Sequence, residues 1–294
     1  MLTLRGVHPA LITPFRDGAV DEPALRALVD RAIDGGVAGL VPCGTTGESV
    51  TLSDEEHGLV IRTVVDQARG RVPVIAGAGT VSTRHSIHLA EQARAAGADA
   101  LLLVCPYYNR PTQAGLEAHF RAILSAVSLP SVLYNIPGRT GVDLSVETLR
   151  RLGDVPEIVA IKEATGNVMR AQQILAACGD RFVVLSGDDG LTLPILSVGG
   201  QGVISVSANA LPKEVSRVVS LFFEGEHEEA RREHLRLLPV HQAMFVESNP
   251  GPVKGLIAAR GHIAPEVRLP LVWPADEVLA GVRRVCDDAN VSLA

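Results

Sequence analysis

The feature that most constrains the fold of this chain is an eightfold alternation of short apolar runs with segments of helical periodicity. The apolar runs are rich in β-branched residues. Most stay hydrophobic throughout instead of alternating with polar residues, which is typical of parallel strands buried on both faces. The eight runs occupy residues 7–15, 39–43, 72–76, 100–105, 131–134, 158–161, 182–185 and 202–206.

The segments between these runs have recognisable helix ends. Ser53 and Glu56 have the spacing of a capping box, and the helix that they begin is expected to end near Gly70. The other helices are expected at 21–36, 82–97, 112–129, 145–152, 167–178, 189–198 and 212–223. Strand-helix units whose spacing shrinks from about 30 to about 20 residues favour a closed (β/α)8 barrel over an open sheet.

The pattern changes near residue 224. A long charged amphipathic helix is expected at 224–245, followed by a Pro- and Gly-containing turn at 249–252 and two further helical stretches. We therefore predict an α/β fold in which residues 1–224 form a (β/α)8 TIM barrel and residues 225–294 form a C-terminal helical extension. A chain of 294 residues allows this, because a barrel of roughly 250 residues can fold as one unit.

The rival fold is a doubly wound sheet that binds a dinucleotide. Its main support would be the sequence GAGTVS at 77–82, which follows an apolar run. The third glycine of the fingerprint is missing, and Asp99 precedes the next run instead of ending it, so the acid that would bind the ribose is misplaced. The barrel is the better prediction.

Composition argues against several classes of partner. The net charge is −6 and no run of Lys or Arg exceeds a pair, which argues against a nucleic-acid interface. The apolar runs fall short of the ~20 residues of a membrane span, and the N-terminus lacks the pattern of a signal peptide. The four cysteines show no C-x-x-C spacing and the histidines no zinc motif. We expect a cytoplasmic protein with reduced thiols and no metal.

Lys162 is the most informative residue, because the active site of a barrel lies at the carboxyl ends of its strands. The run that precedes Lys162 carries no other charge. One interpretation is an ion pair with Glu163, Asp188 or Asp189, or a side chain that reaches solvent. The other is an amine whose pKa is lowered by desolvation, so that it attacks a carbonyl and forms a Schiff base.

Other polar residues also follow the predicted strands. Tyr107, Tyr108 and Tyr134 could pass protons to and from a carbinolamine oxygen, or could be aromatic residues at the rim with hydroxyls in water. The loop GTTGE at 44–48 suits a small carboxylate, although such loops are also common turns. Arg139 could bind a second carboxylate bidentately, or could be an exposed loop arginine.

Taken together, these motifs closely resemble the dihydrodipicolinate synthase family. The similarity runs in order from about residue 6 to residue 272. The matching segments are GTTGE at 44–48, PYYNRP at 106–111, YNIPGRTG at 134–141, IKEATGN at 161–167, SGDD at 186–189, GVISV at 202–206 and NPGPVK at 249–254.

The resemblance implies a class I, metal-free pyruvate lyase. Such an enzyme condenses pyruvate with L-aspartate 4-semialdehyde, the first committed step of diaminopimelate and lysine biosynthesis. Lys162 would form the Schiff base with pyruvate and would need no cofactor. Tyr134 would be the general acid/base, in a proton relay with Thr45 and with Tyr108 from the neighbouring subunit.

The resemblance also implies the binding residues and the assembly. Thr46 and the carbonyl region of Ile204 would hold pyruvate, and Arg139 would bind the carboxylate of the semialdehyde. Gly187 would also belong to the substrate-binding residues. The enamine of pyruvate would attack the aldehyde, after which the amine of the substrate would close the ring and displace the lysine. The family further implies a homotetramer, built as a dimer of dimers.

One departure from the family bears on regulation. In members that lysine inhibits, the positions of Asp54, His57, Val81 and His85 carry His, His, Asn and Glu, and only His57 is the same here. Val81 cannot form a hydrogen bond, and His85 replaces an acid that would pair with an ammonium group. We expect weak or absent inhibition by lysine.

Two alternatives to the synthase stay open. The first is a related aldolase acting on 2-keto-3-deoxy sugar acids, N-acetylneuraminate or another 2-oxo acid. The sialic acid branch typically has Ser-Thr in place of Thr45-Thr46 and lacks the motif around Arg139, so the sequence favours the synthase. The second is a non-catalytic binding protein that keeps a pyruvate pocket, although every catalytic position of the family is filled.

Overall fold

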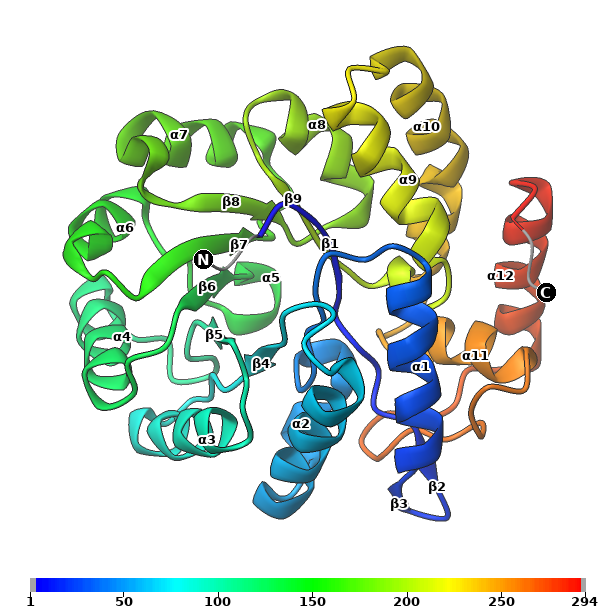
Figure 1. The fold of residues 1–294 in the computed structure, drawn as a ribbon, viewed down its shortest axis with the longest axis horizontal. Coiled ribbons are helices and arrows are strands. Elements are labelled where there is room, and N and C mark those ends of the chain that lie inside the picture. The colour runs from blue at the N-terminus through cyan, green and yellow to red at the C-terminus, as the bar shows by residue number, and fades with distance from the viewer. Residues whose placement is uncertain (1–3, 292–294) are drawn as a thin grey trace.

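Seven parallel strands form one curled sheet in the computed structural model, which describes residues 4–291 (Figure 1). Their spatial order is β1-β9-β8-β7-β6-β5-β4. The bounds are Gly6–Pro9 for β1, Ile75–Gly77 for β4, Ala100–Val104 for β5, Ser131–Asn135 for β6, Ile158–Glu163 for β7, Val183–Ser186 for β8 and Gly202–Ser205 for β9.

Residues 39–43 complete the barrel between β1 and β4. They do so through two isolated parallel bridges, one between Ala10 and Val41 and the other between Leu40 and Val74. The second predicted run, at 39–43, therefore contributes single bridges where the other seven form ladders. The predicted (β/α)8 barrel is confirmed. One of its eight strand positions is occupied by a segment that forms only two isolated bridges.

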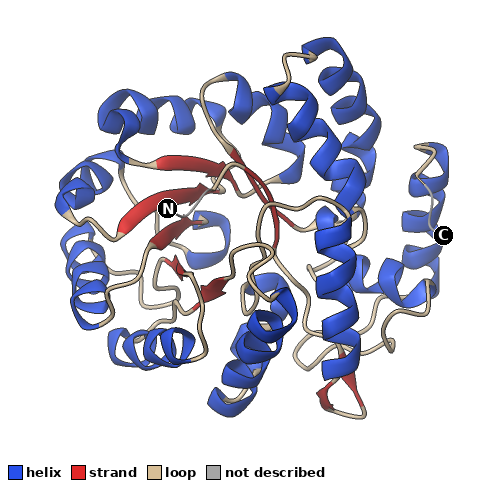
Figure 2. Ribbon diagram, in the orientation of Figure 1, coloured by secondary structure: helices blue, strands red, loops and turns tan. Residues whose placement is uncertain are grey.

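The eight predicted helices surround the barrel, as Figure 2 shows. The predicted capping box is present in α2, where the Ser53 side chain accepts from the Glu56 N–H and the Glu56 carboxylate accepts from the Ser53 N–H. The helices are α1 Glu22–Asp34, α2 Asp54–Ala68, α3 Thr83–Ala95, α4 Gln113–Ala126, α6 Val146–Arg151, α7 Val168–Cys178, α8 Thr192–Ser197 and α9 Pro212–Phe223, with an additional short helix α5 at Pro137–Thr140.

Three helices follow the barrel, as the sequence predicts. They are α10 His227–Ala243, α11 Gly251–Ala259 and α12 Asp276–Asp288. We refer to residues 225–291 as the C-terminal extension. The predicted division of the chain into a barrel at 1–224 and an extension at 225–294 stays a prediction. Residues 1–3 of the barrel and 292–294 of the extension lie outside the described residues. Across residues 4–291, no helix combines the length and the apolar character that a membrane crossing requires.

The prediction of a single strand over residues 7–15 is wrong for the C-terminal part of this range. Strand β1 stops at Pro9, and Phe15 belongs to a small antiparallel hairpin of β2 Phe15–Arg16 and β3 Ala19–Val20. Its turn is Asp17-Gly18, with φ values of 53° and 82°. Positive φ at both positions is the geometry that Asp-Gly favours in two-residue hairpins, so this dipeptide was a signal that the sequence analysis missed.

Alternation along β7 decides which side chains face the inside of the barrel. Ala160 packs with Val132, Tyr134 and Ile204 in the interior cluster, whereas Ile161 belongs to the cluster between strands and helices. Side chains two residues apart in a strand share a face. Lys162 therefore points inward, at the end of the barrel where the parallel strands terminate.

Candidate active site

Lys162 and Tyr134 form the centre of the candidate site. They occupy directly paired positions of β7 and β6 at the carboxyl ends of these strands. The Nζ atom of Lys162 lies 4.1 Å from the centroid of the Tyr134 ring, and both side chains are buried, with 5% exposure each. The packing holds the amine against an aromatic face and away from water.

The acids that could pair with Lys162 use their carboxylates elsewhere. Among residues 4–291, no carboxylate forms an ion pair with this lysine. Burial likewise prevents the side chain from reaching solvent, so the structure supports neither part of the first interpretation of Lys162. The observed partners are the Thr165 N–H and the Asn135 amide for Glu163, the Gly190 N–H for Asp188, and the Ser205 hydroxyl with the Val206 and Ser207 N–H groups for Asp189.

The electrostatic consequence is an amine that loses its proton easily. Burial lowers the pKa of Lys162 from 10.5 to about 7; the negative charge of Asp189 raises this pKa and the positive charge of Arg139 lowers it further. A large share of the amine is then neutral at pH 7. Neutral lysine is the form that attacks a carbonyl carbon.

This pKa predicts the pH dependence of adduct formation. The rate at which pyruvate is trapped on the enzyme should rise as Lys162 deprotonates and level off above about pH 7. It can be measured by borohydride trapping at fixed pyruvate from about pH 5.5 to about pH 9. A rate that keeps rising throughout this range would indicate an amine with the ordinary pKa of 10.5 and contradict the prediction.

Tyr134 has the opposite electrostatic character. Burial raises its pKa to about 12, while the charge of Arg139 and the polar Thr45 side chain act in the lowering direction. The phenol therefore stays protonated at neutral pH and can donate its proton. The Thr45 side chain, which acts on this pKa, is exposed, so it lies between the buried phenol and the surface of the site, where a proton relay could continue.

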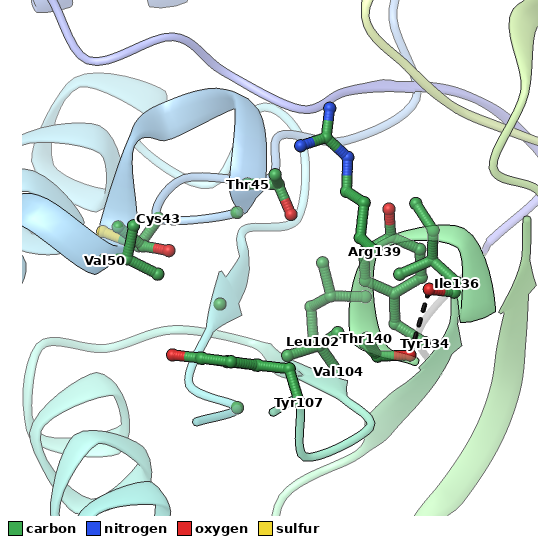
Figure 3. Close-up of a pocket in the computed structure, with 14 residues that line it drawn as sticks. Cys43, Thr45, Val50, Leu102, Val104, Tyr107, Tyr134, Ile136, Arg139 and Thr140 are labelled. Atoms are coloured by element: carbon green, nitrogen blue, oxygen red, sulfur yellow. Dashed lines mark hydrogen bonds between the residues drawn. The ribbon is translucent and has the colours of Figure 1, made fainter. Parts of the chain in front are cut away.

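A cavity of about 220 Å³ opens beside these residues (Figure 3). Thr45, Tyr134 and Arg139 line it, together with Tyr107, so three of the predicted site residues meet around one space. In Figure 3, Thr45 lies across the cavity from Tyr134. The other lining residues are Cys43, Gly44, Ser49, Val50, Gly77, Gly79, Leu102, Val104, Ile136 and Thr140.

Four predicted site residues are not part of this lining. They are Lys162, Thr46, Gly187 and Ile204, of which Ile204 packs inside the barrel and Thr46 is 3% exposed. At Gly187 a Cβ atom would lie 3.1 Å from Cε of Lys162 and 2.6 Å from Cβ of Ala164. A side chain at this position would clash with Ala164 and crowd Lys162, so glycine leaves room for both.

Tyr108 is the one predicted site residue that a single chain leaves outside. Its side chain is 92% exposed, and its backbone has a φ of 68°. The neighbouring Tyr107 lines the cavity in its place. The expected contribution of Tyr108 from a second subunit stays a prediction.

Sequence reasoning missed the role of two glycines. A Cβ atom at Gly77 would lie 2.0 Å from the Cys43 carbonyl oxygen, and one at Gly79 would lie 2.4 Å from the Val104 nitrogen. These glycines let adjacent strand ends approach one another beside the cavity. In the sequence, both glycines belong to the GAGTVS segment that resembles part of a dinucleotide fingerprint, but in the structure they serve the packing of strand ends.

A second cavity of about 140 Å³ adjoins the first and includes Asp54, His57, Val81 and His85. The Asp54 carboxylate lies 2.9 Å from Nε2 of His85 and 3.3 Å from Nε2 of His88. The acid in this cavity is therefore already contacted by two imidazoles, and Val81 offers no polar group.

Comparison with known proteins gives a consistent result. The model of the dihydrodipicolinate synthetase family matches residues 3–287. A protein of Citrifermentans bemidjiense named 4-hydroxy-tetrahydrodipicolinate synthase is 56% identical over 267 residues, which make up 91% of this chain and 92% of that protein.

Solved structures agree with this similarity. The chloride-inhibited dihydrodipicolinate synthase of Acinetobacter baumannii, complexed with pyruvate, is 43% identical, with a TM-score of 0.96 over 99% of this chain and 100% of that chain. The corresponding synthase of Cyanidioschyzon merolae with lysine bound is 38% identical, with a TM-score of 0.95 over 99% of this chain and 100% of that chain.

Proposed function

This chain belongs to the dihydrodipicolinate synthetase family, and we propose that it condenses pyruvate with L-aspartate 4-semialdehyde through a Schiff base on Lys162. The observation that carries the assignment of Lys162 is a buried amine without a carboxylate partner, held against Tyr134 beside a cavity. The product would enter diaminopimelate and lysine biosynthesis.

The proposed reaction begins with attack of the Lys162 amine on C2 of pyruvate. Tyr134 donates a proton to the carbinolamine oxygen, which leaves as water and yields an iminium ion. Loss of a C3 proton gives an enamine, which attacks the aldehyde carbon of the second substrate. The amine of that substrate then bonds to C2 and displaces Lys162. The iminium itself withdraws electrons from C3, so this route requires neither a metal nor an organic cofactor.

The binding residues follow from charge and position. Pyruvate would be held near Thr46, Gly187 and Ile204, of which Thr46 and Ile204 are buried and Gly187 lies against the Lys162 side chain. Arg139 on α5 lines the cavity and is exposed, so its guanidinium is free to bind the carboxylate of the incoming semialdehyde bidentately. Pyruvate would thus bind at Lys162, and the semialdehyde would bind in the cavity beside Arg139.

We propose a homotetramer, arranged as a dimer of dimers, in which Tyr108 completes the relay in a second copy. Support comes from the exposure of apolar side chains beside the site, 92% for Tyr108 and 74% for Val50. A bulky residue with positive φ is unfavourable, which suggests that Tyr108 is placed for a purpose other than the folding of its own chain.

The cytoplasmic location expected from the sequence is part of the same proposal. Cys43, Cys105, Cys178 and Cys286 are all free thiols, which supports a reducing compartment. Three of these thiols are buried, whereas Cys178 is only half-buried.

The function is tested by comparing substrates. Purified enzyme with pyruvate should consume L-aspartate 4-semialdehyde far faster than it cleaves 2-keto-3-deoxy sugar acids or N-acetylneuraminate. Formation of the pyruvate adduct together with preferential turnover of the sugar acids would instead identify a related aldolase. Absence of both adduct and turnover would favour a non-catalytic binding protein.

Inhibition by lysine should be weak or absent. Asp54 is occupied by two histidines and Val81 cannot bind a polar group, so the second cavity lacks a free acid for the ammonium group. We expect little loss of activity even at about millimolar lysine. A variant carrying Val81→Asn and His85→Glu should be inhibited more strongly than the parent enzyme, whereas half-inhibition of the parent at low micromolar lysine would contradict the prediction.

A further inference from the structure

We propose that Asn249, in the C-terminal extension, is a positioning residue that directs the Thr46 hydroxyl toward the carboxylate of pyruvate. This inference rests on the proposed function. The two residues are 203 positions apart in the sequence, yet Nδ2 of Asn249 donates to Oγ1 of Thr46 at 2.9 Å. Both side chains are buried, with 6% exposure for Asn249 and 3% for Thr46.

The direction of this hydrogen bond determines what the hydroxyl can do. Because Oγ1 of Thr46 accepts from the amide, its own hydrogen must point away from Asn249. Within residues 4–291, no acceptor for that hydrogen is found. A buried hydroxyl with its hydrogen free is suited to a ligand that supplies an acceptor, and a carboxylate is such a ligand.

The carbonyl oxygen of the Asn249 amide indicates that the hydrogen bond with Thr46 does not serve stability alone. Oδ1 of Asn249 is buried and has no partner among the described residues. A buried acceptor without a partner costs stability, so a purely structural role would be served better by another side chain. We infer that the role of Asn249 lies in the hydrogen bond that its Nδ2 donates to Thr46.

The rest of the extension holds the 44–48 loop where Asn249 can reach it. Lys254 donates to Oε1 of Glu48 at 2.5 Å and to the Glu266 carbonyl at 2.9 Å, and both charged side chains are almost fully buried. Oε2 of Glu48 accepts from the Arg268 N–H at 2.9 Å. Glu48 has a φ of 54°, a conformation that non-glycine residues adopt rarely and that these contacts maintain.

The decisive test compares Asn249→Asp with Asn249→Ala. In the aspartate variant, the new carboxylate accepts the hydrogen of the Thr46 hydroxyl and places a negative charge beside the carboxylate of pyruvate. The pyruvate concentration that half-saturates borohydride trapping should therefore rise at least ~10-fold. In the alanine variant, the freed hydroxyl can still turn to pyruvate, so the rise should be smaller. A merely structural role predicts the reverse order, because aspartate has nearly the shape of asparagine and alanine leaves a cavity.

Three controls complete the experiment. Asn290→Asp adds the same charge at an exposed position of the extension and should leave trapping unchanged. Thermal unfolding verifies that each variant folds. In a Thr46→Val background, Asn249→Ala should have no further effect on pyruvate binding, since the hydroxyl that it orients is gone.

The outcomes separate this inference from the proposed function. Trapping needs no semialdehyde, so the test does not depend on the second substrate. Equal half-saturation in all Asn249 variants, or a greater loss in the alanine variant, would overturn the positioning role alone. Absence of trapping in the parent enzyme would overturn the Schiff-base function and this inference with it.

Discussion

A Lys162→Ala variant is expected to lose at least ~10³-fold in kcat, because the nucleophile that forms the covalent intermediate is removed. The protein should still fold, since this lysine forms no ion pair among the described residues and its removal leaves no buried charge without its partner. Steady-state assay with pyruvate and semialdehyde, together with thermal unfolding, measures both effects.

The chain offers a matched control for this loss. Of its three lysines, Lys213 is exposed and Lys254 is paired with Glu48, so only Lys162 combines burial with the absence of an ion pair. Lys213→Ala should retain full activity. An active Lys162→Ala enzyme would show that another group performs the chemistry.

A Tyr134→Phe variant should lose about 10²- to 10⁴-fold in kcat, because it removes the proton donor of the carbinolamine step. The ring that packs against the lysine amine remains, so burial of Lys162 and the resulting low pKa should be preserved. Borohydride trapping after long incubation should therefore still label Lys162, at a much lower rate. The rate of adduct formation is the measurement that separates this variant from Lys162→Ala.

Tyr107→Phe is the matched control for the hydroxyl. Tyr107 lines the same cavity, and its hydroxyl has no part in the proposed relay. Its removal should cost far less than the removal of the Tyr134 hydroxyl. Equal losses in the two variants would place the proton transfer elsewhere.

The barrel could be predicted from the sequence because its signals are local. Continuous apolar runs reflect burial on both strand faces, and the Ser53–Glu56 capping box depends on residues three positions apart. The reduction of residues 39–43 to two bridges could not be predicted, because it depends on how β1 and β4 approach from either side. The β2–β3 hairpin was predictable from Asp17-Gly18 and was missed.

The candidate site likewise contains residues that could be predicted from the sequence and contacts that could not. Lys162 was identifiable because a single charge ends an apolar strand, and Tyr134 because it ends the strand before it. The contact of Asn249 with Thr46 spans 203 residues, and the pairing of Asp189 with the end of β9 spans 16 to 18. No local pattern encodes these contacts, which exist only once the barrel closes and the extension packs against it.

Borohydride reduction in the presence of pyruvate, followed by peptide mapping, tests the central claim most directly. The account predicts one pyruvate-derived adduct, located on the peptide that contains Lys162, in an enzyme that also consumes L-aspartate 4-semialdehyde. An adduct on Lys213 or Lys254, or no adduct at all, would contradict the Schiff-base mechanism.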